Sequence, residues 1–352
     1  MERETNQWDI VIIGGGQAGL AVGYFLRKIN KQFIILEKNN RIGDSWRMRW
    51  DSLKLFTPSQ YDGLPGMPFP DLKGSFPGKD QMADYLERYV KEYSLPVQLN
   101  MKVNHLFTQN NHYEIDTAGN KIIARKVVIA TGTNPFPNIP AISSDISREI
   151  FQIHSSGYTN PDSLPPGDVL VVGAATSGIE IALEISKTHR TFISGNPPFH
   201  IPDNPIRYGG GLYWWFISNI LTVRTPIGKK VKKKIIRGGS PLIRVSANDL
   251  KVAGITRLPR VAGVEDGYPK LEDSTIVKVK SIIWATGYRP DFSWIGTDIT
   301  DETGWPVSER GISPVKKGLY FAGMPFQFGL TSGLVGGVGR DAAYIARHIR
   351  HN

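Results

Sequence analysis

The chain has 352 residues, the length of about two domains. It contains no cysteine, which excludes disulphides, thiolate metal sites and a redox-active cysteine pair, and it fits a cytoplasmic protein. The net charge of +10 is compatible with nucleic acid, membrane surfaces or anionic ligands, and we attribute it to a phosphate-rich cofactor and surface lysines. The polar N-terminal residues are not typical of a signal peptide, and the uncharged run 318–339 is broken by glycines and is not expected to span a membrane.

The first predicted element is a dinucleotide-binding unit. Residues 10–13 form a short apolar run, typical of a buried parallel strand. Gly14, Gly16 and Gly19 follow with the spacing G-x-G-x-x-G. In this motif the first glycine makes a tight turn, the second lets the backbone approach a pyrophosphate, and the third lets a helix, predicted over 18–29, pack on the strand. The N-terminus of that helix would face the phosphates.

The second predicted strand, residues 32–38, contains Glu37, which lies 18 residues after Gly19. A carboxylate at this position accepts hydrogen bonds from the ribose hydroxyls and disfavours a 2′-phosphate. The first unit is therefore expected to bind FAD or NAD rather than NADP.

Residues 126–133 and 281–290 are near copies of each other. Each is an apolar strand that ends in Ala-Thr-Gly and is followed by a proline-containing segment. Because they flank a second glycine-rich unit, we interpret them as two connecting strands around an inserted domain. Two unrelated buried strands are the alternative.

The second glycine-rich unit opens at Val169. Gly173 and Gly178 hold the outer positions of the motif, and Ala175 replaces the middle glycine. The extra methyl group is expected to hold a pyrophosphate further out or more weakly, without abolishing the turn. A purely structural βαβ unit is the alternative to a dinucleotide site.

The position that corresponds to Glu37 in this second unit is Asn196. It is neither a carboxylate that selects NAD nor an arginine that grips a 2′-phosphate. Arg190 precedes the strand 191–194, and Arg207 lies well downstream. The preference between NADH and NADPH is therefore open.

Two such units predict an α/β fold with two Rossmann-like dinucleotide-binding domains. The NAD(P)H-binding domain (161–285) is inserted into the FAD-binding domain (1–160 and 286–352). Hydride then passes between nicotinamide and flavin, because the cofactors carry the chemistry. A C-terminal helix, starting near Ser332 and ending at 348, would stabilise negative charge on a reduced flavin.

Residues 211–239 differ from the rest of the chain. Thirteen uncharged residues are followed by a block with seven lysines and arginines and no acid. An interfacial membrane helix has this composition, and so does a helical cover over an active site with a solvated basic flank. We favour the cover and keep membrane contact as the alternative. Nucleic-acid binding is not expected, because no binding module surrounds the block.

Taken together, these motifs resemble the flavin-containing monooxygenases, in particular the short bacterial members and the plant indole-pyruvate monooxygenases. The resemblance extends over essentially the whole chain. The matching stretches are RIGDSW (41–46), LKLFTPSQYDGLPGMPFP (53–70), FPGKDQMADYLERYVKEYSL (76–95), HSSGY (154–158) and WATGY (284–288).

The resemblance implies that NAD(P)H reduces FAD and that O₂ then forms a C4a-(hydro)peroxyflavin, which oxygenates a small organic substrate at a heteroatom or carbonyl group. The alternative is an NAD(P)H oxidase, or a flavin or quinone reductase, that produces peroxide without oxygenating a substrate. Neither the substrate nor the oligomeric state can be read from the sequence, and a homodimer is left open.

The sequence departs from the family pattern at several positions. Asp44 replaces the second glycine of the tryptophan motif, and Ala175 and Thr176 replace a glycine and a polar amide in the second unit. Met324 stands where many flavoproteins have an aspartate.

Two residues are candidates for catalysis. Thr57 is expected either to hydrogen-bond flavin N5 or a peroxide, or to cap the turn before Pro58. His154 is expected either to position the nicotinamide or to act at the hinge between the domains, and a linker histidine that is satisfied within the protein is the alternative. No metal site is predicted. The candidate cofactor-binding residues are Gly14, Gly16, Gln17, Ala18, Gly19, Glu37, Lys38, Gly43, Asp44, Ser45, Trp46, Leu55, Thr57, Val103, Ala130, Thr131, Gly132, Gly173, Ala175, Thr176, Ser177, Gly178, Ser194, Ala285, Thr286, Gly287, Gly323 and Ser332.

Overall fold

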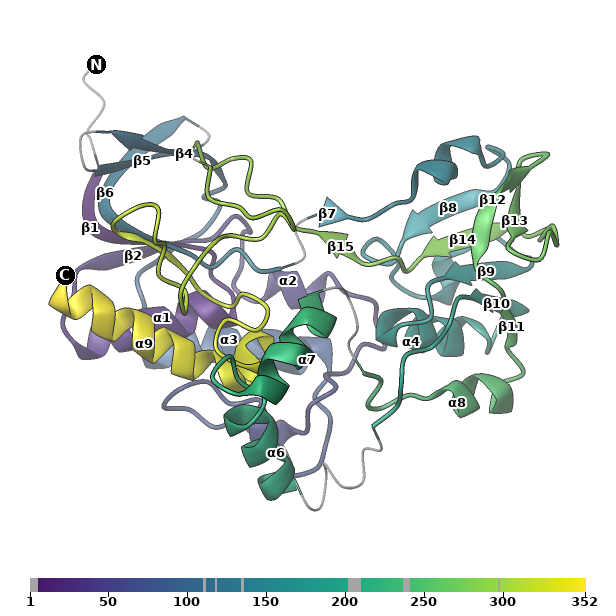
Figure 1. Cartoon of the computed structure of the whole chain (residues 1–352), viewed down its shortest axis with the longest axis horizontal. Coiled ribbons are helices and arrows are strands. Elements are labelled where there is room, and N and C mark those ends of the chain that lie inside the picture. The colour runs from purple at the N-terminus through teal and green to yellow at the C-terminus, as the bar shows by residue number, and fades with distance from the viewer. Residues whose placement is uncertain are drawn as a thin grey trace.

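Two β-sheets lie at opposite ends of the long axis of the molecule, each with helices packed against it (Figure 1). The computed structural model describes residues 6–109, 112–117, 119–133, 136–201, 210–236, 241–296 and 298–352. Both sheets contain the parallel βαβ arrangement of Rossmann-like units, so the predicted α/β class is confirmed.

The first sheet has seven strands in the order β3-β2-β1-β6-β5-β4, with β16 also paired to β6. The strands are β1 (Asn6–Ile13), β2 (Phe33–Leu36), β3 (Val97–Gln98), β4 (Val103–Gln109), β5 (His112–Thr117), β6 (Asn120–Ile129) and β16 (Leu319–Phe321). Neighbouring strands are parallel except at β5, which runs antiparallel to β4 and β6. Strand β16 confirms the strand expected in the C-terminal stretch.

Three helices cover one face of this sheet: α1 (Gln17–Lys28), α3 (Lys79–Glu92) and α9 (Val338–His351). Their apolar side chains form one core, to which Leu20, Tyr85 and Ile345 belong. The core on the other face includes Phe292 and Ile295. The apolar runs of β1 and β2 are explained by this two-sided burial.

The second sheet has five parallel strands in the order β11-β10-β9-β14-β8. The strands are β8 (Phe151–His154), β9 (Val169–Val172), β10 (Thr191–Ser194), β11 (Thr256–Leu258) and β14 (Ser281–Trp284). Helices α4 (Thr176–Ile185) and α8 (Ala247–Val252) supply side chains to the core on one face. The hairpin β12 (Val261–Glu265) and β13 (Tyr268–Leu271) contributes to the core on the other face.

The two sheets are connected by β7 (Phe136–Pro137) and β15 (Tyr288–Arg289), which pair with each other in antiparallel fashion (Figure 1). Both strands follow the Ala-Thr-Gly segments of the sequence. The domain boundaries at 160/161 and 285/286 stay a prediction. Strand β8 pairs with β14 although it precedes residue 161, so we propose that the first crossover lies at β7.

The remaining elements are short or lie at the lower side of Figure 1. They are α2 (Asp44–Arg47), α6 (Gly210–Asn219), α7 (Pro226–Ile236) and the 3-10 turns η1 (Ser59–Tyr61), η2 (Ala141–Asp145), η3 (Pro161–Ser163), η4 (Leu330–Gly333) and η5 (Val335–Gly337). In the described part of the chain, no helix is long and apolar enough to cross a bilayer.

The expected start of the C-terminal helix near Ser332 was wrong, because α9 begins at Val338. Residues 330–337 form η4 and η5 instead. The backbone of this stretch packs closely on its neighbours. A Cβ atom on Gly336 would lie 1.8 Å from the Tyr61 carbonyl oxygen, and one on Gly337 would lie 1.8 Å from the Thr331 carbonyl oxygen.

Candidate dinucleotide sites

The first glycine loop connects β1 to α1, and its three glycines serve different purposes. A Cβ atom on Gly14, whose φ is +110°, would lie 2.4 Å from the carbonyl oxygen of Ala130. A Cβ atom on Gly19 would lie 2.0 Å from the carbonyl oxygen of Gly14. Gly16 has a φ of −80°, and no heavy atom would lie within 4 Å of an added Cβ. Gly14 and Gly19 are therefore required by the packing of the chain itself, whereas Gly16 faces open space.

This open space lies at the N-terminus of α1, for which Gly16 is the N-cap residue. The first N–H groups of a helix have no partner within the helix, and its dipole favours negative charge there. The residues present therefore fit the pyrophosphate of a dinucleotide.

Glu37 follows β2 and places its buried carboxylate beside the same loop. Oε2 accepts a hydrogen bond from the Gly15 N–H at 2.8 Å, and Oε1 accepts one from the Asn39 N–H at 2.9 Å. Each carboxylate oxygen retains a further lone pair, so the pair can also accept ribose hydroxyls. The N–H of Met101 donates a hydrogen bond to the Glu37 carbonyl oxygen at 2.8 Å, and Val103 begins β4 two residues further along the chain.

The second glycine loop, between β9 and α4, repeats the backbone contacts of the first. Gly173 has a φ of +111°, and its added Cβ would lie 2.3 Å from the carbonyl oxygen of Ala285. An added Cβ on Gly178 would lie 1.9 Å from the carbonyl oxygen of Gly173. The turn persists without the middle glycine, as expected. Ala175 has φ −82° and ψ −177°, against −80° and −177° at Gly16, a conformation open to any L-residue.

The methyl group of Ala175 is exposed at the N-cap of α4. It occupies the position that corresponds to the open space beside Gly16. Thr176 and Ser177 begin α4 and are half-buried. Weaker binding of a pyrophosphate by the alanine stays a prediction.

The end of β10 shows which groups could select between NADH and NADPH. Ser194 is buried, and its hydroxyl donates to the Pro259 carbonyl oxygen at 2.7 Å and accepts from the Val261 N–H at 3.1 Å. Arg190 lies at the opposite end of the strand, 3.6 Å from Asp168. Arg207 lies outside the described residues. The coenzyme preference therefore remains open.

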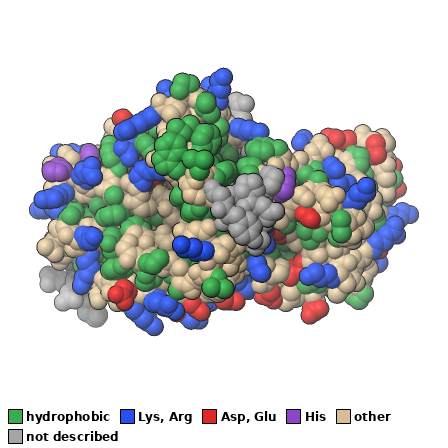
Figure 2. All heavy atoms as spheres, turned by 90° about the horizontal axis from the view of Figure 1, so that it is seen from below, with side chains coloured by type: hydrophobic (Ala, Val, Ile, Leu, Met, Phe, Trp, Pro, Cys, Tyr) green, Lys and Arg blue, Asp and Glu red, His purple; other side chains and the backbone are tan. Residues whose placement is uncertain are grey.

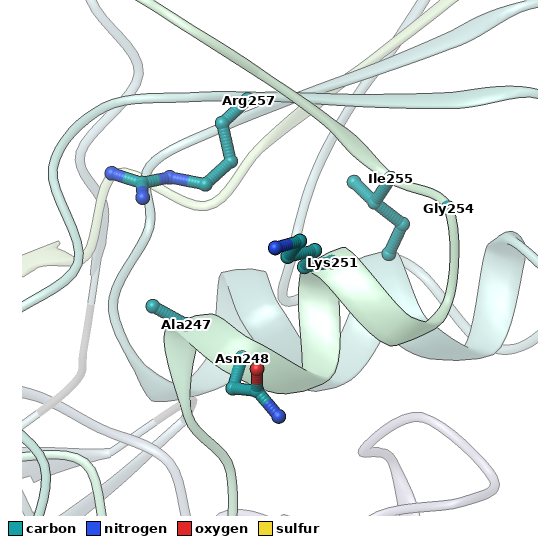
Figure 3. A pocket seen from close by; sticks show the side chains of 6 residues that line it. All are labelled: Ala247, Asn248, Lys251, Gly254, Ile255 and Arg257. Atoms are coloured by element: carbon teal, nitrogen blue, oxygen red, sulfur yellow. The ribbon is translucent and has the colours of Figure 1, made fainter.

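A surface cavity of about 610 Å³ lies along α8 and β11, at the outer edge of the second sheet (Figure 3). It is lined by Ala247, Asn248, Lys251, Gly254, Ile255 and Arg257. None of the predicted site residues contributes to it, so this cavity is separate from both glycine loops.

The tryptophan motif 41–46 forms a turn and helix α2 against α3. Gly43 has a φ of +88°, and its added Cβ would lie 2.7 Å from the Ala83 carbonyl oxygen. The carboxylate of Asp44 is buried and lies 3.4 Å from Arg47, which also pairs with Asp84 at 2.8 Å. The acid that departs from the family pattern thus has an ion-pair partner directly after the motif. Trp46 packs against the core beneath α1 and α3.

Thr57 and Asp62 form a buried pair in the segment that follows. Thr57 Oγ1 donates a hydrogen bond to Asp62 Oδ1. Asp62 is fully buried, its Oδ2 has no hydrogen-bond partner among the described residues, and burial raises the pKa of its carboxyl to about 7. Sequence reasoning missed Asp62, because Asp-Gly is a common turn dipeptide. Leu55 is buried near this pair in the chain.

His154 ends β8 and uses both ring nitrogens within the protein. Nδ1 accepts from the Ser156 N–H at 3.1 Å, so Nε2–H donates to the Gly287 carbonyl oxygen at 3.0 Å. Burial lowers the pKa of the imidazole, which keeps it neutral at physiological pH. The ring also meets Tyr288 edge-on, with centroids 5.2 Å apart. This geometry favours the hinge interpretation of His154.

Hydrogen bonds join the second Ala-Thr-Gly segment to Asn138, which follows the first segment and β7. Thr286 Oγ1 donates to the Asn138 carbonyl oxygen at 2.5 Å, and Asn138 Nδ2 donates to the Thr286 carbonyl oxygen at 3.2 Å. Arg49, just after the tryptophan motif, donates to Tyr288 Oη at 2.7 Å. Asn138 and Arg49 were not identified from the sequence, because these contacts join segments far apart in the chain.

The other predicted residues lie at the ends of strands or in turns. Ala130, Thr131 and Gly132 follow β6, and Gly323 approaches α1 so closely that its added Cβ would lie 2.7 Å from Ala18 Cβ. The buried hydroxyl of Ser332 accepts from the N–H groups of Phe328 and Gly329 at 2.9 and 3.1 Å. The structure thus gathers Gly14, Glu37, Ala130 and Gly323 near one end of α1. Lys38 is exposed.

Two glycine loops, each in a parallel βαβ unit of one of two linked sheets, define the class of two-dinucleotide oxidoreductases. Residues 11–194 match the pyridine nucleotide-disulphide oxidoreductases, and the chain belongs to this family. Its resemblance to the flavin-containing monooxygenases is confirmed, and it is an NAD(P)H-dependent flavoprotein oxidoreductase that uses FAD. Since the chain has no cysteine, it has no disulphide of its own to reduce.

Comparison with individual proteins supports this assignment. The chain is 38% identical over 344 residues to the "Uncharacterized oxidoreductase CzcO-like" of Geobacillus kaustophilus, covering 97% of this chain and 98% of the relative. It is 26% identical over 383 residues to the "Probable indole-3-pyruvate monooxygenase YUCCA9" of Arabidopsis thaliana, covering 96% and 88%. The solved structure of a flavin-containing monooxygenase from Stenotrophomonas maltophilia has the same fold, with a TM-score of 0.81, 24% identity and 99% coverage of both chains.

Proposed function

We propose that the protein is a monooxygenase that takes two electrons from NADH or NADPH and transfers one oxygen atom of O₂ to a small organic substrate, at a heteroatom or carbonyl group. In the balanced reaction, NAD(P)H, a proton, O₂ and substrate give NAD(P)⁺, water and the oxygenated product. The observation that carries the proposal is the repeated glycine-loop geometry on two linked sheets, in a chain without cysteine. Such a protein can pass electrons from one dinucleotide to another and must release them to an external acceptor.

The names of two related proteins support O₂ as that acceptor. The Arabidopsis relative is described as a probable indole-3-pyruvate monooxygenase, and the Stenotrophomonas structure as a flavin-containing monooxygenase. FAD, when bound, would supply the redox chemistry that links oxidation of NAD(P)H to O₂ and to transfer of one oxygen atom to the substrate.

The residues of the chain bind and orient the two cofactors in this proposal. The open space at Gly16 receives the FAD pyrophosphate at the N-terminus of α1, and Glu37 accepts the adenosine ribose hydroxyls. The corresponding turn at Gly173 and Ala175 receives NAD(P)H. The hydrogen bonds of His154 and Asn138 hold the connecting strands in register between the two sites.

Thr57 and Asp62 hold a proton away from water. With Asp62 ionised, Thr57 Oγ1 donates a hydrogen bond to Asp62 Oδ1, and its lone pairs can accept a hydrogen bond from another group. With Asp62 protonated, the carboxyl can donate to Thr57 instead, and the threonine hydroxyl can then donate elsewhere. Because wetting such a site favours peroxide release over oxygen transfer, the burial of both side chains supports the proposal.

Rapid mixing of the NAD(P)H-reduced holoenzyme with O₂ tests the reaction. We expect a transient flavin absorbance that differs from both the oxidised and the reduced form, and less than one peroxide per NAD(P)H once a substrate is present. Direct return to oxidised flavin, with one peroxide per NAD(P)H across a panel of amines, thioethers and ketones, would assign the protein to the oxidase or reductase class.

A variant pair tests the role of Thr57. Thr57→Val removes the hydroxyl and is expected to raise the fraction of NAD(P)H electrons released as peroxide by severalfold, whereas Thr57→Ser retains the hydroxyl and should resemble the wild type. Equal peroxide yields in the two variants would show that Thr57 has only a structural role, in the turn before Pro58.

A further inference from the structure

Helix α6 and the turn that follows it are attached to η1, to α9 and to the loop before η4. The indole ring of Trp214 stacks on Tyr61 with centroids 4.6 Å apart and an interplanar angle of 12°. Arg340 Nη1 donates to the Ser218 carbonyl oxygen at 2.6 Å, and the Val223 N–H donates to the Phe328 carbonyl oxygen at 2.9 Å. These contacts use one side of α6 and of the turn that follows it.

The outer side of α6 is apolar as well. Leu212, Trp215 and Phe216 are 76%, 54% and 42% exposed, and their spacing places them on one stripe of the helix. Ile227 at the start of α7 is 55% exposed. A helix that is hydrophobic all round is normally buried, and a contiguous exposed apolar patch marks an interaction site. No residue in the described part of the chain covers the outer stripe of α6, which is therefore available to a partner.

Positive charge lies next to this stripe. Residues 210–236 contain no acid and six basic residues: Arg224, Lys229, Lys230, Lys232, Lys233 and Lys234. All are exposed except the half-buried Lys232. Figure 2 views the molecule from below, so that α6, the lowest helix in Figure 1, faces the reader; hydrophobic side chains gather there with Lys and Arg side chains beside them. Lys234 lies over the ring of Phe199 at 4.4 Å, which extends the basic and apolar surface beyond the two helices.

We propose that α6 and α7 form a docking surface for the headgroup region of an anionic phospholipid bilayer. Trp, Phe and Leu side chains next to a lysine cluster are the composition of an interfacial helix, with the apolar stripe at the acyl boundary and the lysines at anionic headgroups. A second copy of the chain would bring six like charges against six. A nucleic acid would pair with the lysines and leave Leu212 and Ile227 in water. Charge complementarity together with the apolar stripe therefore selects the bilayer.

Co-sedimentation of the full-length, FAD-loaded protein with vesicles tests the proposal. The vesicles contain either phosphatidylcholine alone or an equimolar mixture with phosphatidylglycerol. We expect binding to the mixed vesicles, little binding to phosphatidylcholine alone, and release at about 1 M salt, where the Debye length is only about 3 Å.

Two variants remove the two halves of the surface. Trp215→Ser combined with Phe216→Ser removes the apolar stripe, and Lys229→Gln, Lys230→Gln and Lys233→Gln together remove three charges. Each variant is expected to lower the vesicle partition constant at least about tenfold. A basic residue near an anionic surface and an apolar side chain buried in the interface each contribute substantially to the free energy of membrane binding. The FAD content and the melting temperature show that the variants are folded.

Matched controls lie on the second sheet and its helices. Lys187, Lys251 and Lys280 are exposed there, and their combined change to Gln removes the same charge. Val252 on α8 is 79% exposed, and Val252→Ser removes a smaller exposed apolar side chain there. Both controls should bind mixed vesicles like the wild type.

Several outcomes would overturn the proposal. Absence of wild-type binding to mixed vesicles at low salt would do so. Equal losses of vesicle binding in the lysine variant and in its lysine control would also do so. A wild-type dimer that Trp215→Ser and Phe216→Ser convert to a monomer would assign the face to self-association. DNA binding that the lysine variant loses, with vesicle binding unchanged, would assign it to nucleic acid. None of these measurements depends on the proposed oxygenation.

Discussion

Thr57 Oγ1 donates a hydrogen bond to Asp62 Oδ1, while Asp62 Oδ2 has no partner in the described part of the chain. Removal from water disfavours the charged form of a carboxyl group, so burial raises the pKa of Asp62 from 3.8 to about 7. The pair therefore titrates close to physiological pH, in the segment that resembles the flavin-lining segment of the family.

The first prediction is that this carboxyl makes stability depend on pH. Because its pKa is higher in the folded than in the unfolded protein, the folded state binds more protons between pH 4 and 7, and the free energy of unfolding falls as pH rises through this window. Asp62→Asn carries no titrating proton and should lose this fall, which amounts to about 2.7 kcal/mol between pH 5 and pH 8, because about two of the three pKa units of the shift lie above pH 5. Urea denaturation of the FAD-loaded protein at pH 5 and pH 8 measures it.

Asp273→Asn is the control, because hydrogen bonds from Thr275 lower the pKa of this exposed carboxyl and move it below the window. Its change in stability between pH 5 and pH 8 should equal that of the wild type. Parallel pH curves for wild type and Asp62→Asn would show that Asp62 does not titrate in this range.

The second prediction separates the two requirements for glycine in the first loop. Gly19→Ala forces a Cβ atom to within 2.0 Å of the Gly14 carbonyl oxygen and should cost on the order of 3 kcal/mol of stability. Gly16→Ala meets no atom within 4 Å and should leave the apoprotein within about 0.5 kcal/mol of the wild type. It should nevertheless weaken FAD binding about tenfold or more, because its methyl group enters the space assigned to the pyrophosphate. Unchanged FAD affinity in Gly16→Ala would place the pyrophosphate elsewhere.

The third prediction is the reverse change in the second loop. Ala175→Gly removes an exposed methyl group from the position that corresponds to Gly16, and the Kd for NADH or NADPH should fall severalfold. Anaerobic titration of the FAD-loaded enzyme measures the Kd. Gly178→Ala serves for comparison: its Cβ would lie 1.9 Å from the Gly173 carbonyl oxygen, so it should lose reduction by NAD(P)H while retaining FAD. If Ala175→Gly binds NAD(P)H no better than the wild type, the methyl group does not limit the approach of the pyrophosphate.

The fourth prediction concerns the coenzyme. Ser194 uses its hydroxyl within the protein, Arg190 lies at the far end of β10, and Asn196 is neither acidic nor basic. We therefore expect weak discrimination between NADH and NADPH. The steady-state kcat/KM with each coenzyme measures it, and a hundredfold preference, roughly 3 kcal/mol, would contradict the expectation.

Local sequence patterns were sufficient for the two glycine loops, the acid at Glu37 and the paired Ala-Thr-Gly strands. In each case the requirement acts within a few tens of residues. A left-handed φ at Gly14 and Gly173, and a helix that crosses a strand at Gly19 and Gly178, exclude any side chain, so the residue type itself records the backbone geometry. For the same reason Ala175 was correctly expected to preserve the turn, since its φ is negative.

Only the tertiary structure decided what depends on burial and on contacts between distant segments. Asp62 is part of an ordinary Asp-Gly turn in the sequence, and its high pKa arises from the segments that pack over it. The neutral His154 is fixed by Gly287, far along the chain, and the C-terminal helix starts at Val338, after a stretch in which Gly336 packs closely on Tyr61. The outer stripe of α6 is exposed because Trp214 and Ser218 direct the other side inward. A backbone position that only glycine can occupy is a local requirement and is visible in the residue type. Burial depends on the packing of the whole fold and cannot be recognised from the type of a single residue.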